Sequence, residues 1–143
     1  MSSASLDITI LGSGTSTGIP VVGCQCAVCR SDDPRNRRTR CSALLNYGPH
    51  NILIDTATDL RQQALREDIR HIDAVLYTHS HADHMHGIDD LRGFNRRGKG
   101  PIPLYGSRRT LERVRDNFNY IFADIENPGC VPRLSPHPID TAF

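Results

Sequence analysis

Histidine and aspartate are concentrated in one short segment, YTHSHADHMHGIDD at residues 77–90, which holds four histidines and three aspartates. Imidazole nitrogens combined with carboxylate oxygens suit Zn, Mn or Fe better than Mg or Ca. Side chains two apart on an extended loop point the same way, so we expect His79 and His81 to share one ion. Asp83 and His84, in the turn that follows, would then face a second ion. A solvated histidine-rich loop is the alternative to this metal site.

Two such ions would make the segment a hydrolytic site. A pair of divalent ions can polarise a phosphoryl or acyl oxygen and activate water near neutral pH. Asp83 is the candidate catalytic residue, because its carboxylate could also orient the attacking water. His86 and Asp89 belong to the same turn and could fix the orientation of a ligand imidazole, as residues around metal ligands commonly do. Exposed side chains are an equally good interpretation of these two residues.

Three of the five cysteines form a second candidate metal site. Cys24, Cys26 and Cys29 lie in CQCAVC, whose spacing favours thiolate ligation over a ladder of disulfides. A closed structural zinc site needs four ligands, and three are offered here. Cys41 and Cys130 are the substitutes within the chain, although we expect Cys41 to be a buried strand residue. Reduced thiols without metal are the alternative.

The elements that must position these residues follow from hydrophobic periodicity. Two helices are expected, over 58–67 behind a Thr58 cap and over 107–122 behind a Ser107 cap. Short runs with strand-like patterns are expected to form the β-structure, and they cover residues 6–11, 41–47, 51–55, 73–78 and 102–106. Because the run 73–78 ends where the histidines begin, the candidate site sits at a strand end. The proline-rich stretch 128–138 predicts no element.

Composition limits the remaining possibilities. With 143 residues and 38% hydrophobic residues, we expect one α/β domain spanning residues 1–143. The net charge of +1 gives no global field that would favour nucleic acid or an anionic membrane surface. No apolar window is long enough to span a membrane, and the first ten residues lack the pattern of a secretory signal. These features predict a soluble, cytoplasmic protein.

Two further segments could contact phosphate. GSGTSTG at 12–18 has Thr17 where a dinucleotide-binding loop needs its third glycine, so it predicts a turn-rich loop. The basic run RNRRTR at 35–40 lacks interleaved aromatic residues, which favours a solvated loop over an RNA surface. Arg96, Arg97 and Lys99 lie nearer the histidine segment in sequence and are better candidates for phosphate contact.

The segment His79-Ser80-His81-Ala82-Asp83-His84, with Gly87 after it, resembles the HxHxDH motif of the metallo-β-lactamase fold superfamily. The segments GCQCAVC, RTRCSALL, HADHMHGIDDLRGFN and IPLYG together resemble the subgroup that includes the phosphoribosyl cyclic phosphate phosphodiesterase. The resemblance implies an αββα sandwich with two active-site metal ions, Zn or Mn. It also implies that Asp55, at the end of its strand, supports the metal loop. The three cysteines would carry a structural zinc.

In that family, further metal ligands come from a second half of the sandwich: a later histidine, a bridging aspartate and a final histidine. A histidine near the C-terminus completes the structural zinc site. This chain resembles the N-terminal half only, so we expect a truncated domain that exposes a sheet face and self-associates. The sequence around His137, RLSPHPIDTAF, resembles the family segment that leads into the strand before the third histidine. We therefore expect a surface or packing role for His137.

The residues and the resemblance together predict a metal-dependent hydrolase, namely a phosphodiesterase acting on small or cyclic phosphodiesters. One alternative is a nuclease of the tRNA 3′-processing kind, which shares the histidine motif but against which the cysteine loop argues. Nucleic acid is therefore a possible but less favoured partner, and no membrane partner is expected. Another alternative is a non-catalytic metal-binding remnant, because half of the ligand set has no counterpart here.

Overall fold

The computed structural model of the protein describes residues 5–95, 100–123 and 129–140. A six-stranded mixed sheet forms its framework, with spatial order β1-β2-β3-β4-β5-β6 identical to the sequence order. β1, β2 and β3 pair antiparallel, whereas β3 to β6 pair parallel. The strands are β1 Leu6–Gly12, β2 Ser42–Tyr47, β3 His50–Ile54, β4 Ala74–Leu76, β5 Ile102–Gly106 and β6 Leu134–Pro138.

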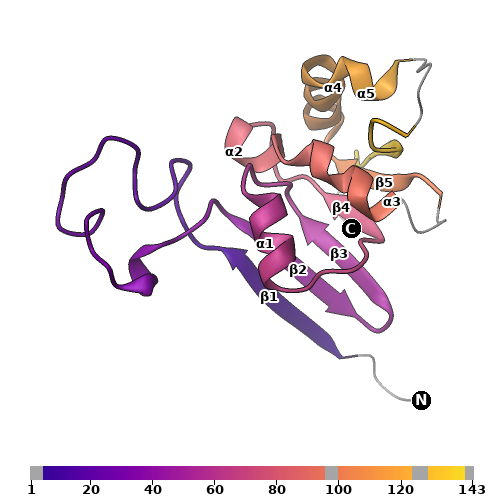
Figure 1. Ribbon diagram of the computed structural model, residues 1–143. Coiled ribbons are helices and arrows are strands. Elements are labelled where there is room, and N and C mark those ends of the chain that lie inside the picture. Colours follow the sequence, from indigo (N-terminus) through magenta and orange to yellow (C-terminus); the bar gives the residue numbers. More distant parts are fainter. Residues whose placement is uncertain (1–4, 96–99, 124–128, 141–143) are drawn as a thin grey trace.

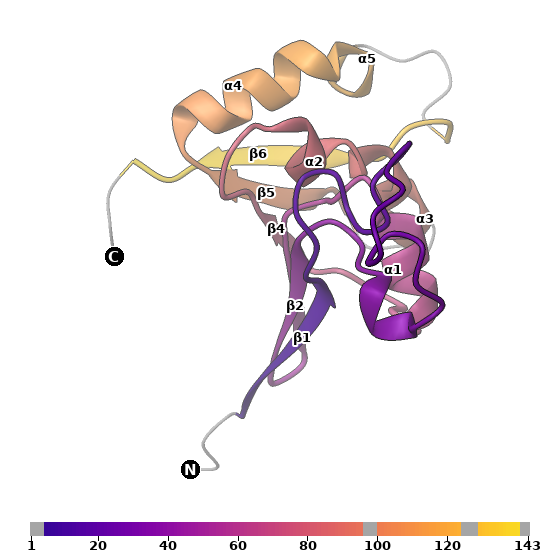
Figure 2. The ribbon, with the colours of Figure 1, turned by 90° about the vertical axis from the view of Figure 1, so that its left-hand side faces the viewer.

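Helices make the crossovers between the parallel strands and gather on one face of the sheet (Figures 1 and 2). Parallel neighbours need such crossovers, and the helices cover the apolar face that the strands present. The helical elements are η1 Pro34–Asn36, α1 Leu60–Arg66, α2 Ala82–Met85, η2 Ile88–Leu91, α3 Arg92–Asn95, α4 Arg108–Asn117 and α5 Asn119–Phe122. Within the described ranges, no helix has the length and apolar character needed to cross a membrane.

The core lies between this helical layer and the sheet. Leu44, Leu53, Val75 and Leu104 sit side by side on four successive strands and are all buried. Helix residues such as Leu60 close over them. Strand side chains alternate between faces, so the neighbouring residues on each strand point to the opposite side of the sheet.

The opposite face carries no helix among the described residues (Figure 2). Leu6, Ile8 and Ile10 of β1 lie on this face and are 57%, 59% and 60% exposed. The molecule is therefore a two-layer α/β structure with one covered and one bare sheet face. This is the arrangement expected of half an αββα sandwich, and it confirms the predicted fold class.

Several local expectations need correction. Helix α1 begins after Asp59 instead of Thr58, because the Thr58 hydroxyl donates to the carbonyl of Ala82 (3.4 Å) and is not used as a cap. The expected helix over 107–122 is interrupted at Phe118, whose backbone leaves helical geometry (φ −123°, ψ 41°). Ser107 does cap α4, since its hydroxyl accepts from the Thr110 backbone N–H (3.2 Å).

The proline-rich tail contains a strand that the sequence did not predict. β6, with sequence LSPHP, pairs with β5 and is the last strand of the sheet among the described residues. Proline is tolerated on an edge strand because an N–H on the outer side has no ladder partner to lose. Cys41 is exposed and precedes β2 by one residue, so the expectation of a buried strand cysteine was wrong.

Candidate metal centres

The histidine segment follows β4 at the C-terminal edge of the parallel strands. His79 and His81 lie on the loop between β4 and α2, while Asp83 and His84 lie in the single turn of α2. Asp55 follows β3, which is parallel to β4, so it emerges at the same edge. Ligands from the β4–α2 segment and a supporting residue from β3 are thus placed together by strand direction.

Asp55 anchors the segment through three hydrogen bonds. Its Oδ1 accepts from the backbone N–H of Thr78 (2.8 Å), and its Oδ2 accepts from the Thr78 hydroxyl (2.6 Å) and from His84 Nδ1 (2.8 Å). Asp55 is 3% exposed and adopts a left-handed backbone conformation (φ 59°), which aspartate tolerates better than most residues. Its own N–H donates to the Leu76 carbonyl of β4 (2.9 Å), so its backbone is also held in place.

These hydrogen bonds determine which ring nitrogen of His79 and of His84 is left free of the Asp55–Thr78 network. A carboxylate only accepts, so His84 Nδ1 carries a proton, and Nε2, which lies 3.3 Å from Asp83 Oδ2, is the ring nitrogen left for a metal ion. The Thr78 hydroxyl has one proton, which it donates to Asp55, and it therefore accepts from His79 Nδ1 (3.0 Å). Nε2 of His79 is likewise the ring nitrogen left for a metal ion. In both histidines the network engages Nδ1 and leaves Nε2 for a ligand bond.

The ring of His79 lies between the other two histidine rings. Its centroid is 4.6 Å from that of His81 and 4.0 Å from that of His84. His84 Nε2 is 3.3 Å from Asp83 Oδ2. His79 therefore contacts both the loop histidine and the turn histidine. The division of the four residues between two ions stays a prediction. No three of the four residues bring ligand atoms within 4.8 Å of one another, so the segment gathers the nitrogen and oxygen donor types that suit zinc or manganese without holding them in a closed set.

A second set of contacts holds α2 against the sheet edge. The Thr56 hydroxyl donates to the Met85 carbonyl (3.1 Å) and accepts from the Tyr77 hydroxyl (2.8 Å). Complete burial raises the pKa of Tyr77 far above its usual value; the hydrogen bond to Thr56 opposes this shift and the Asp55 charge adds to it. Tyr77 thus stays a neutral donor. Gly87 lies so close that an added Cβ would be 2.1 Å from the Ala57 carbonyl oxygen, so only glycine fits there.

Other candidates from the sequence have different surroundings. His86 is exposed and its ring packs edge-on against Phe118, with centroids 5.5 Å apart. His137 is exposed on β6 and stacks on Tyr105, with centroids 5.4 Å apart. The predicted role of His86 in fixing the orientation of a ligand imidazole stays a prediction. The candidate phosphate contacts at positions 96, 97 and 99 lie outside the described residues.

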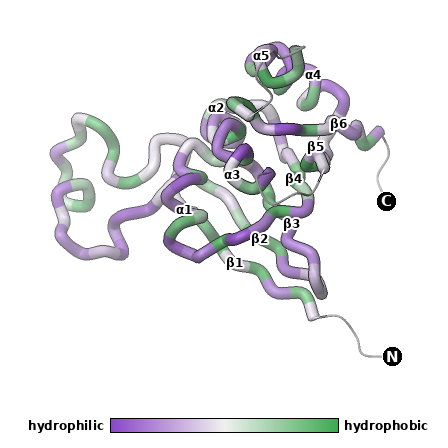
Figure 3. Tube along the Cα trace, turned by 45° about the vertical axis from the view of Figure 1, so that its right-hand side comes forward, coloured by the Kyte–Doolittle hydropathy of each residue, from purple (hydrophilic) through white to green (hydrophobic). Residues whose placement is uncertain are grey.

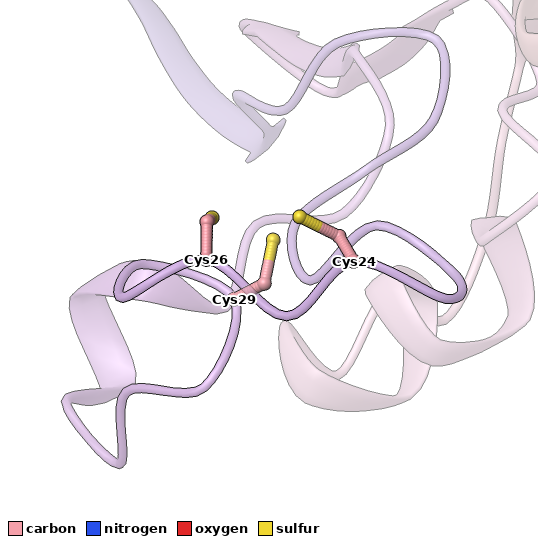
Figure 4. A group of neighbouring side chains, drawn as sticks. All are labelled: Cys24, Cys26 and Cys29. Atoms are coloured by element: carbon pink, nitrogen blue, oxygen red, sulfur yellow. The ribbon is translucent and has the colours of Figure 1, made fainter.

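The cysteine triplet forms the second centre, in the long β1–β2 loop (Figure 4). The sulfur atoms of Cys24, Cys26 and Cys29 all lie within 4.8 Å of one another, and among the described residues this is the group that satisfies that criterion. Three converging thiols fit a thiophilic ion such as zinc. Cys41 and Cys130 are both exposed.

Local interactions shift the pKa values of two of these thiols in opposite directions. The backbone N–H of Cys29, followed by side-chain interactions with Cys24 and Cys29, lowers the pKa of Cys26 to about 7. The Val21 N–H donates to the Cys29 sulfur (3.4 Å) and lowers its pKa, but the hydrogen bond with Cys24, desolvation, the hydrogen bond with Cys26 and the charge of Cys24 raise the pKa of Cys29 overall. One thiol of the triplet is therefore a ready thiolate near neutral pH.

Thr78 and Thr56 are the residues of this region that sequence reasoning missed. Both are ordinary strand-end threonines in the sequence, and only the three-dimensional contacts reveal their hydrogen bonds. The position of Thr78, immediately before the first histidine of the motif, was the one available signal.

Comparison with known proteins places these centres in context. A family model described as "Beta-lactamase superfamily domain" matches residues 50–143. Octanoyltransferase of Porphyromonas gingivalis is 46% identical over 121 residues, which are 84% of this chain but 24% of that protein. The chain therefore spans about a quarter of that curated relative.

Two solved structures share the arrangement over nearly the whole chain. A diphosphatase from the PhnP family is 42% identical, with a TM-score of 0.83, and the match covers 94% of this chain and 51% of that one. Zn²⁺-bound PqqB from Methylobacterium extorquens is 27% identical, with a TM-score of 0.70, and the match covers 95% of this chain and 50% of that one. The described sheet and its helices therefore correspond to about half of each relative, and the chain belongs to the beta-lactamase superfamily, with the metallo-β-lactamase fold.

Proposed function

We propose that the chain carries part of the active site of a metal-dependent hydrolase, a phosphodiesterase acting on small or cyclic phosphodiesters. The observation that carries this proposal is the Asp55 network, which presents Nε2 of both His79 and His84. A buried carboxylate that orients two imidazoles is typical of a metal site and serves no purpose in a solvated loop. The likeness to a PhnP-family diphosphatase supports chemistry at phosphorus.

In this proposal four residues hold the ions. His79, His81, Asp83 and His84 supply the nitrogen and oxygen donors, and two divalent ions, Zn or Mn, would supply Lewis acidity and an activated water when bound. Asp83 would orient the attacking water through the carboxylate that now lies 3.3 Å from His84. Asp55 and Thr78 would keep the imidazoles in their ligating tautomers throughout.

The cysteine triplet would bind a structural zinc away from the reaction. It lies in the β1–β2 loop, whereas the histidines follow β4 (Figure 1). A closed zinc site stabilises a loop that contains little regular structure, because the ligands cross-link its turns. The fourth ligand would come from outside the triplet. A relative with bound zinc supports the general affinity of this fold for that metal.

A non-catalytic metal-binding role is the second candidate. It is favoured by the coverage of about half of each solved relative, since an active site shared with the rest of such a protein would be incomplete in these residues alone. It differs from the first candidate in activity, not in metal binding. A nuclease acting on structured RNA is the remaining alternative within the hydrolase class.

The test combines metal content with turnover. The purified chain, loaded with zinc or manganese, would be assayed on bis(p-nitrophenyl) phosphate, on a 2′,3′-cyclic nucleotide and on a precursor tRNA. We expect hydrolysis of the small diesters, and a loss of roughly 100-fold or more in His84→Ala, which removes a ligand. His50→Ala, at an exposed position on β3, is the matched control and should keep full activity.

Each alternative has its own outcome in that experiment. Metal bound without turnover would support the non-catalytic role for these residues on their own. Turnover of the precursor tRNA alone would identify the nuclease. Equal activity in the wild type and in His84→Ala would exclude the histidine loop as the reacting site.

A further inference from the structure

The three cysteines of the β1–β2 loop are close enough to react with one another as well as to bind a metal ion. Their sulfur atoms all lie within 4.8 Å of one another, and Figure 4 shows them on the same side of the loop. All three are free thiols. When an oxidant is present, two thiols this close can form a sulfur–sulfur bond after rotation of their side chains. The loop can therefore be cross-linked in two ways, by a metal ion or by a disulfide.

Cys26 and Cys29 share one turn of the backbone. The Arg30 N–H donates to the Cys26 carbonyl (3.0 Å), which closes an α-type turn over residues 26–30. Residues three apart in such a turn have Cα atoms about 5 Å apart, within the roughly 4.4 to 6.8 Å that disulfides span. Cys24 belongs to a different turn, closed by its own N–H and the Val21 carbonyl (3.0 Å). A Cys26–Cys29 bridge therefore fits the backbone as it stands, whereas a bridge to Cys24 would join two separate turns.

We propose that Cys26 and Cys29 form a reversible disulfide on oxidation by hydrogen peroxide, and that this bridge excludes zinc from the triplet. Cys26 is the exposed thiol of the three, and its thiolate attacks a peroxide oxygen. The S–O bond forms, the O–O bond breaks, and the departing hydroxide takes up a proton to give water. The Cys29 thiol then attacks the sulfur of the Cys26 sulfenic acid. The S–S bond forms, the S–O bond breaks and a second water leaves, so the two sulfurs lose the two electrons that the peroxide gains.

The disulfide and the zinc site use the same sulfur atoms. A zinc ligand from cysteine is a thiolate, and the two sulfurs of a disulfide carry no such charge. Oxidation therefore leaves Cys24 as the one thiol of the triplet, too few for a structural zinc site. The bridge itself depends on the thiols alone. Only the competition with zinc rests on the structural zinc proposed above.

The loop is closed at its base, so a change of cross-link stays local. Ile19 and Arg38 exchange two backbone hydrogen bonds across this base (2.9 and 2.8 Å). The Arg40 guanidinium pairs with the Asp59 carboxylate (2.9 Å), which ties the base to the start of α1. Figure 3 shows the loop projecting from the sheet beyond its base. Oxidation should therefore alter residues 20–37 and leave the sheet and the histidine segment in place.

Treatment of the 143-residue chain with hydrogen peroxide, metal-free and zinc-loaded, tests the proposal. In the metal-free chain we expect the loss of two thiols per chain, with Cys26 and Cys29 joined in the peptides that mass spectrometry identifies without reduction. Dithiothreitol should restore both thiols. The zinc-loaded chain should form the same bridge more slowly, because bound thiolates are less available for attack, and should release its zinc to a chromogenic chelator as the bridge forms. Changes in hydrogen exchange should be confined to residues 20–37.

Three variants separate the expected pair from the other cysteines. Cys29→Ser should abolish the bridge, because it removes the thiol that completes the reaction. Cys24→Ser should retain the bridge, since Cys24 lies outside the shared turn. Cys130→Ser is the matched control: Cys130 is also exposed but lies between α5 and β6, and its replacement should leave the rate of bridging unchanged.

Several outcomes would overturn the proposal. A bridge that includes Cys24, Cys41 or Cys130 in the wild type would do so, as would oxidation of Cys26 to sulfinic acid without any bridge. Zinc retained at the triplet by the bridged chain would refute the exclusion. A chain that forms the Cys26–Cys29 bridge but binds no zinc when reduced would support the disulfide and refute the structural zinc, so the two proposals fail separately.

Discussion

Replacing Asp55 by asparagine isolates the role of the buried carboxylate. The side chain keeps its size, and asparagine tolerates the left-handed conformation of this position (φ 59°) as well as aspartate does. If the amide oxygen keeps the bond to the Thr78 N–H, the NH₂ group takes the place of Oδ2. It then faces the Thr78 hydroxyl and His84 Nδ1, both of which donate to Oδ2 in the wild type.

The expected effects follow from these two contacts. The Thr78 hydroxyl can rotate and accept, but His84 must either lose a buried hydrogen bond or move its proton to Nε2. The first outcome costs about 1 to 3 kcal/mol of folding free energy, the usual cost of leaving a buried polar group unpaired. The second removes the lone pair that would bind metal. Removal of such a supporting contact typically weakens metal binding by roughly 10- to 100-fold.

Cobalt titration measures the effect at the histidine loop separately from the cysteines, because thiolate ligation alone gives intense near-ultraviolet charge-transfer bands. Asp68→Asn is the matched control, since Asp68 also has a positive φ (50°) but its side chain is 71% exposed and pairs with Arg70. We expect weaker binding at the loop only in Asp55→Asn, with unchanged cysteine bands. Wild-type cobalt affinity at the loop in Asp55→Asn, together with an unchanged His84 tautomer by ¹⁵N NMR, would refute the reasoning.

Three further predictions concern the packing beside the histidine segment, the cap of α4 and the pKa of a cysteine thiol. Gly87→Ala should lower the free energy of unfolding in urea by about 1 to 3 kcal/mol, because its Cβ would overlap a carbonyl oxygen of the preceding loop. Gly93→Ala, with open space around the added Cβ, should be neutral or stabilising by up to about 1 kcal/mol, and an equal loss in both variants would contradict the packing argument. Ser107→Ala should cost about 1 kcal/mol in the same assay, since it removes the cap of α4. Alkylation of Cys26 by iodoacetamide in the metal-free chain should reach half its maximal rate near pH 7, because the Cys29 N–H stabilises the thiolate; a midpoint near 9 would argue against this effect.

The strands that build the site were predictable because their patterns are strong. Residues 51–55 and 73–78 are compact apolar runs, and they correspond to β3 and β4 with Asp55 and the histidine segment at their ends. Strand direction then accounts for their meeting at one edge. The cysteine cluster was equally visible, because three cysteines within six residues can hardly avoid one another in a turn-rich loop.

The errors came from residues whose side chains have long-range partners. Thr58 and Asp59 are both good cap residues by type, yet Thr58 bonds to Ala82 and the Asp59 carboxylate accepts from the Arg40 N–H (2.8 Å), so α1 begins without a side-chain cap. In β6, Pro136 and Pro138 suggested a break, but an edge strand allows proline. In each case a contact far away in sequence overrode the local preference.

The same distinction explains why Thr78 escaped notice while the histidines did not. A metal ligand can be recognised in a sequence from its residue type and spacing. Thr78, in contrast, orients a histidine only because β3 brings Asp55 within 2.6 Å of its hydroxyl. The hydroxyl proton is committed to that carboxylate, which leaves His79 no choice of tautomer. The ligand geometry therefore depends on the pairing of β3 with β4 more than on the motif itself. A change that shifts this pairing should damage metal binding even if every ligand is retained, whereas a charge placed on the bare face at Ile8, two strands away, should leave it intact.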